Sequence, residues 1–184
     1  MLTALVIVTA LVVDLGIVRH ARRSNQSVAD LSALAAGQAL GADPAPDGRA
    51  GCVDALGYLK SNLTGAPSGL TVPCNSLPAS CSLATSPVTI NDGGTGGDWA
   101  VEITFPVSDA MILDSSVAAG DSLRLDDGIP CERLRVTVER TTDSLFAGIM
   151  GRSTFNVSAD AVVRQVQASD RRVPSLWLLD PYGC

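Results

Sequence analysis

The sequence predicts an α+β protein, with a long N-terminal helix followed by an antiparallel β-sheet domain that carries one or two short helices. Three observations support this fold class. Residues 2–40 contain no proline and keep a helical pattern. Residues 99–105, 133–139 and 155–161 alternate between apolar and polar or small side chains, as half-buried strands do. Five cysteines are spread through a glycine- and proline-rich region, which is typical of disulfides formed in an oxidising compartment.

The first part of the predicted helix is apolar. Asp14 is the one charged residue in residues 2–18 (LTALVIVTALVVDLGIV). As a helix this segment is roughly 26 Å long, close to the thickness of the hydrocarbon core of a membrane, about 30 Å. A cleavable signal peptide is the alternative, but no basic residue precedes the apolar run and the helical pattern continues beyond it. We therefore interpret the segment as a retained transmembrane helix.

The helix is predicted to continue to about residue 40 and to end at Pro44. Its total length, on the order of 55 Å, is about twice what a membrane anchor needs. The excess predicts packing against its own domain or against other copies, helped by small side chains that allow close approach. The residues that follow the helical spacing are Ile17, Ala21, Ser24, Val28, Leu31, Ala35 and Gln38. We expect Val28, Leu31 and Ala35 at these contacts, so that Leu31→Glu abolishes assembly or export.

Charged residues at the end of the apolar run raise two questions. Asp14 is interpreted either as solvated at the membrane edge beside Arg19 or Arg22, or as a buried carboxylate that needs a cation from a neighbouring subunit. Arg19, Arg22 and Arg23 would stay in the cytoplasm by the positive-inside rule, whereas the cysteines place the following domain outside. A basic leader upstream of Met1 would resolve this conflict.

The following domain, residues 41–184, is expected to begin with a linker over residues 41–51. A short amphipathic helix over residues 52–63 would place Val53, Leu56, Leu59 and Leu63 on one face. A second short helix is predicted over residues 142–150, between the last two long strands. A final strand over residues 175–179 would bring the sheet to about four strands. The chain is thus divided into a transmembrane and assembly helix, residues 1–40, and an extracytoplasmic α+β domain.

The disulfide candidates are Cys52, Cys74, Cys81 and Cys131, which leaves Cys184 as a free or interchain thiol. Five cysteines allow several pairings. We expect Cys74–Cys81, which closes a short loop, together with Cys52–Cys131.

Enzyme, metal and nucleic-acid functions find no support in the sequence. His20 is the single histidine, and no nucleophile, phosphate-loop or zinc motif occurs, so we expect no catalytic residue, metal or cofactor. The net charge is −6 and the cations form no basic stripe, which disfavours binding to nucleic acid.

A family resemblance rests on an ordered set of short motifs in the first 40 residues. They are residues 12–16 (VVDLG), residues 21–23 (ARR), Gln26, the pair Ala29 and Asp30, and residues 33–36 (ALAA). With the apolar run before them, they resemble the N-terminal signature of the TadE/TadG-like proteins of bacterial tight-adherence (Flp) pilus systems. Residues 146–151 followed by residues 156–159 also look similar.

The resemblance implies a pilin-like role, and the chain length favours a minor subunit over a small major pilin. Such a subunit would sit in the bacterial cell membrane with its C-terminal domain outside, or in an extracellular pilus. Its partners would be other copies, other pilin-like subunits and the inner membrane. The alternative is a membrane-anchored monomer that acts as an adhesin, a binding module or a pilus-assembly factor.

Overall fold

The structure is a computed structural model. The residues described are 2–41, 46–63, 72–81, 88–92, 99–112, 130–146, 148, 151, 153–165 and 177–179. In chain order the elements are α1 (Leu2–Leu40), α2 (Gly48–Asn62), η1 (Cys74–Ser76), β1 (Val88–Asp92), β2 (Trp99–Phe105), α3 (Asp109–Ile112), η2 (Pro130–Glu132), β3 (Arg133–Asp143), β4 (Thr154–Arg164) and β5 (Trp177–Leu179). Cys184 lies outside the described residues.

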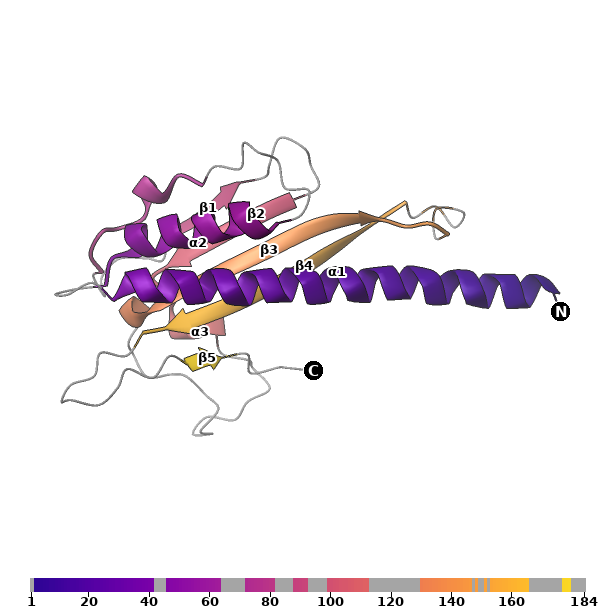
Figure 1. The fold of residues 1–184 in the computed structure, drawn as a ribbon, viewed down its shortest axis with the longest axis horizontal. Helices are drawn as coiled ribbons and strands as arrows, with labels where there is room; N and C mark the ends of the chain where they lie inside the picture. Colours follow the sequence, from indigo (N-terminus) through magenta and orange to yellow (C-terminus); the bar gives the residue numbers. More distant parts are fainter. Residues whose placement is uncertain are drawn as a thin grey trace.

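In the described part of the chain, five strands form one sheet in the order β1-β2-β3-β4-β5, and every neighbouring pair is antiparallel. One face of this sheet carries α1 and α2, and the free end of α1 extends beyond it (Figure 1). The predicted α+β class with a long N-terminal helix and an antiparallel sheet is therefore confirmed. The alternating patterns correctly located β2, β3 and β4, and the final predicted strand corresponds to β5.

The C-terminal half of α1 lies on β3 and β4 through small side chains. Gly37 marks a close approach, because a Cβ atom there would collide with the side chain of Val163 on β4. The apolar residues that α1 contributes to the core are Ala29, Ala33, Ala36 and Leu40. Small side chains let the helix axis approach the sheet closely, so this half of α1 belongs to the core of the domain.

The helix α2 begins at Gly48, inside the segment predicted as a linker. The side chain of Asp47 caps it by accepting hydrogen bonds from the backbone N–H groups of Arg49 and Ala50, at 2.9 and 3.2 Å. Of the predicted face, Leu59 and Leu63 are buried and Leu56 packs against the core. The buried residues of α2 are Gly48, Gly51, Cys52, Ala55 and Leu59, whereas Val53 is exposed. The smallest side chains face the neighbouring elements because α2 packs closely against α1.

The inner face of the sheet supplies the large side chains of the core. Cross-strand register places Ile103 of β2 opposite Val136 of β3, and Val136 opposite Ala161 of β4. All three are buried. At one end of β3 the buried guanidinium of Arg133 lies 2.6 Å from a carboxylate oxygen of Asp109 on α3. This ion pair compensates the charge that Arg133 carries into the core.

Two disulfides join the cysteines predicted to form them, but the predicted pairing is wrong. The bonds are Cys52–Cys74, which links α2 to η1, and Cys81–Cys131, which links the segment after η1 to η2. Cys74 is buried against α2 rather than turned toward Cys81, because η1 packs on that helix. Cys81 is thereby left to reach the start of β3.

Candidate functional site

The N-terminal end of α1 extends beyond the sheet (Figure 1), and the helix exposes large apolar side chains from Val8 to Leu15. Successive residues of a helix are about 100° apart, so these positions cover most of its circumference. The exposed residues are Val8, Leu11, Val12, Val13 and Leu15. A helix that is apolar on most sides is normally buried in a core or a membrane. In the isolated chain this surface therefore has no apolar partner of matching size among the described residues.

Asp14 lies within this apolar stretch, but it is only 6% exposed. Its carboxylate accepts hydrogen bonds from the hydroxyl of Ser144 at 2.8 Å, from the backbone N–H of Leu145 at 3.0 Å, and from that of Phe146 at 3.2 Å. These donors all come from the connection between β3 and β4. A carboxylate that accepts several backbone hydrogen bonds keeps its charge at a lower desolvation cost.

The β3–β4 hairpin runs beside α1 toward its free end (Figure 1). A hydrogen bond of 2.8 Å from Ser144 N–H to Ser153 C=O closes it, and Gly151 adopts a positive φ of 82°. At its tip Leu145 is 66% exposed and Phe146 is 40% exposed. Both side chains thus face away from the domain while their backbone N–H groups point at Asp14.

The short helix predicted over residues 142–150 is wrong for residues 142–146, although Gly148 lies in a 3-10 turn. Thr142 and Asp143 still belong to β3, and Leu145 and Phe146 form a bend. The N–H groups that a first helical turn would leave without partners are instead satisfied by Asp14. Asp14 is buried, as the second interpretation of this residue expected, and not solvated as in the first. The hairpin donors were part of neither interpretation.

The structure places the other predicted assembly residues in different environments. Arg19, Arg22 and Arg23 are exposed on α1, as is His20. Val28 packs against the core and Ala35 is half-buried, but Leu31 is 42% exposed. From Ala21 onward, the non-glycine residues that α1 buries are Ala21, Asn25, Ala29, Ser32, Ala33, Ala36 and Leu40. Only Ala21 is shared with the predicted spacing.

Asn25 and Gln26 add polar contacts between α1 and β4. The side-chain amide of Asn25 donates to Val157 C=O at 2.9 Å, and that of Gln26 donates to Asp160 C=O at 3.1 Å. These bonds fix the position of α1 along the strand between the Asp14 contact and the small-residue core. Sequence reasoning missed this pair and the hairpin residues Ser144 and Leu145, and it named Phe146 only as the start of a stretch that looks similar to the family. An apolar Leu-Phe pair between two strands was a further signal.

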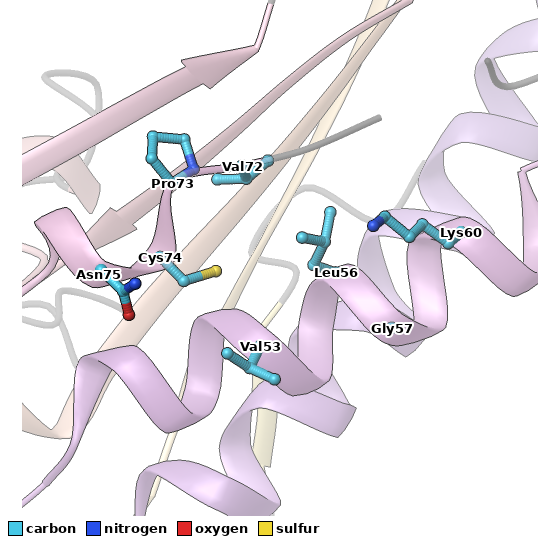
Figure 2. A pocket seen from close by; sticks show the side chains of 8 residues that line it. All are labelled: Val53, Leu56, Gly57, Lys60, Val72, Pro73, Cys74 and Asn75. Atoms are coloured by element: carbon cyan, nitrogen blue, oxygen red, sulfur yellow. The ribbon is translucent and has the colours of Figure 1, made fainter. Parts of the chain in front are cut away.

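A hollow of about 440 Å³ lies between α2 and the segment before η1 (Figure 2). Its lining residues are Val53, Leu56, Gly57, Lys60, Val72, Pro73, Cys74 and Asn75. Lys60 is the one charged side chain of this lining, and Cys74 is bonded to Cys52. The lining therefore offers neither an acid–base pair nor a free nucleophile.

Among the residues that the structure describes, no helix combines the length and the apolar character needed to cross a membrane. No group of three or more His, Cys, Asp or Glu side chains is arranged there to hold a metal ion.

Comparison with known proteins adds no relative. No family model matches the chain, and no curated protein and no solved structure matches it.

Proposed function

We propose that the chain is a structural, pilin-like subunit of a tight-adherence (Flp) type pilus or a related filament, and that it assembles through its N-terminal helix. One observation carries the proposal: a single helix is divided into two halves with opposite surroundings. Small residues hold the C-terminal half against the chain's own sheet. The N-terminal half projects with its apolar side chains exposed. A subunit needs one half for its fold and the other for its partners.

The free energy available to assembly comes from this projecting half. Burial of apolar surface stabilises by about 25 cal/mol per Å². Monomeric soluble proteins seldom expose contiguous apolar surface of more than a few hundred Å². Bundling with the projecting helices of other subunits would bury Leu11, Val12 and Leu15 on several sides at once. The favoured partners are therefore other copies of this chain or other pilin-like subunits.

The same segment supports a proposed location. The apolar run starts at Leu2 in the sequence and extends through Val18, so before assembly it would reside in the bacterial cell membrane with the domain outside. The two disulfides favour an oxidising compartment for that domain. The N-terminal motifs that resemble TadE/TadG-like proteins support the same class, with the extracellular pilus as the final location.

The test compares two valines that are almost equally exposed. Val12 on α1 is 60% exposed and Val53 on α2 is 57% exposed. We expect Val12→Glu to abolish recovery of the protein in high-mass particles sheared from cells, because a carboxylate cannot enter a helix bundle unpaired. Val53→Glu, on the domain, should assemble like the wild type. Non-reducing gels and circular dichroism would verify that both variants fold.

Two outcomes would overturn the filament proposal. One is normal assembly of Val12→Glu. The other is a wild-type chain that is displayed on cells but never enters high-mass particles, which would favour the membrane-anchored monomeric adhesin or assembly factor.

A further inference from the structure

We propose that the β3–β4 hairpin tip is a second membrane contact, which seats Leu145 and Phe146 at the interface of an anionic phospholipid surface beside α1. The inference rests on the membrane location included in the proposed function, but not on filament formation. It begins with the contact between Asp14 and the tip. Because the N–H groups of Leu145 and Phe146 bond Asp14, both side chains lie at the level along α1 where the apolar segment meets the charged one.

Apolar character continues from the helix to the tip. Leu145 and Phe146 are exposed next to the segment of α1 that exposes Val13 and Leu15. Residues 144–153 contain no Asp or Glu. Two separate parts of the chain therefore present apolar side chains at the same level. Beyond this level, α1 extends past the end of the β3–β4 hairpin (Figure 1).

The positive charge of the exposed arginines near the tip favours an anionic lipid surface over a second protein surface. Arg19 and Arg23 follow Asp14 by five and nine residues, which places them about 7–14 Å farther along the helix. Together with Arg22 they are exposed, at the depth that headgroups occupy when apolar side chains lie about 5–10 Å into the interface. Asp143 is exposed at the base of the tip, so the arginines outnumber the exposed acids here.

Asp14 makes the arrangement compatible with a lipid interface. A bare carboxylate at the edge of the hydrocarbon is costly. Here Asp14 is only 6% exposed, and its carboxylate accepts hydrogen bonds from the hairpin tip. The tip thus screens the carboxylate from lipid and adds two apolar side chains. Two contacts, the helix and the tip, would fix the depth and the rotation of α1 in the membrane, which a single helix leaves free.

The test reads the depth of the tip in the full-length protein. Phe146→Trp and, as the matched control, Val53→Trp are each reconstituted into vesicles of phosphatidylcholine brominated near the headgroup, with or without phosphatidylglycerol. The fluorescence of Trp99 and Trp177 is subtracted with the wild type. We expect a blue shift and strong quenching for the indole at position 146, and neither for that at position 53. Phosphatidylglycerol should increase the quenching, and Arg22→Gln combined with Arg23→Gln should remove that increase.

Two results would overturn the inference. The first is an indole at position 146 that remains unquenched although the protein floats with the vesicles. The second is a blue shift that depends on protein concentration and occurs without vesicles, since the tip would then pack on another copy. Failure of the proposed function is detected separately. It would show as a lack of high-mass particles, independently of the quenching measured at position 146.

Discussion

The two halves of α1 share one backbone geometry but differ in what their side chains can pack against. Residues 21–40 turn alanines, one glycine and Leu40 toward a sheet that lies close to the helix. Residues 8–18 carry valines and leucines that touch little of the domain. Asp14, held by the hairpin tip, lies near the boundary. The difference teaches that side-chain size, more than hydrophobicity, decides which half of the helix folds with its own domain.

The largest expected difference between the halves concerns two leucines. Leu40 is fully buried and Leu11 is 62% exposed. We expect Leu40→Ala to lower the free energy of unfolding by about 2–5 kcal/mol because it opens a cavity. Leu11→Ala should change it by less than about 0.5 kcal/mol. Urea denaturation followed by circular dichroism measures both. Equal losses would contradict the division of the helix.

Alanine substitutions at two glycines, one in each half of α1, are expected to change the stability of the fold in different directions. A Cβ on Gly37 would collide with Val163, whereas one on Gly16 would meet no atom within 4 Å. Gly37→Ala should destabilise the fold by about 1–3 kcal/mol through overpacking. Gly16→Ala should leave it unchanged or stabilise the helix by up to about 1 kcal/mol. Thermal unfolding of the two variants tests the pair, and a stabilising Gly37→Ala would refute close approach of α1 to β4.

Removal of the hydrogen bonds between Asp14 and the hairpin tip should have a smaller and more local effect on stability. Asp14→Ala removes the acceptor for the N–H groups of Leu145 and Phe146. Because the opened tip can bond to water, we expect a loss of about 1 kcal/mol in global stability. Hydrogen exchange of those two amides should accelerate by roughly tenfold or more. Asp54→Ala, at an exposed position of α2, is the control, and unchanged exchange in Asp14→Ala would argue against the contact.

The smallest effect on folding is expected at Leu31, which lies on the half of α1 that packs on the domain but is exposed. Leu31→Glu should alter the free energy of unfolding by less than about 0.5 kcal/mol. If the exposed side of this half also contacts neighbouring subunits, the same variant loses assembly while remaining folded. Shear fractions and denaturation curves, measured on the same preparation, separate these outcomes. An assembled Leu31→Glu would restrict the assembly surface to the projecting half.

Local pattern explains which predictions succeeded. The strands β2, β3 and β4 were predictable because alternation is set by neighbours along the chain. The uninterrupted sequence up to Leu40 likewise predicted the length of α1. The buried stripe of α1 was harder to predict, because it follows small residues such as Ala29 and Ala36 instead of the larger Val28 and Leu31.

Contacts between distant segments explain the errors. Asp14 and Ser144 are 130 residues apart, and neither residue alone indicates the other. The segment after Asp143 has the pattern of a short helix, but Leu145 and Phe146 form a bend whose N–H groups bond the distant Asp14. The disulfide pairing failed for the same reason, since sequence spacing favoured the short Cys74–Cys81 loop whereas the packing of η1 on α2 brings Cys74 to Cys52.

The two disulfides have a consequence for a protein exposed to proteases. Cys52–Cys74 and Cys81–Cys131 enclose separate stretches of chain, 22 and 50 residues in span. A cut at any peptide bond within either stretch leaves both fragments covalently joined. Such a nicked chain would keep the strands β1 and β2 attached to β3, and it would migrate as two pieces on a gel only after reduction. The two disulfides therefore keep the fragments of the chain together after cleavage, even though they do not prevent the cleavage itself.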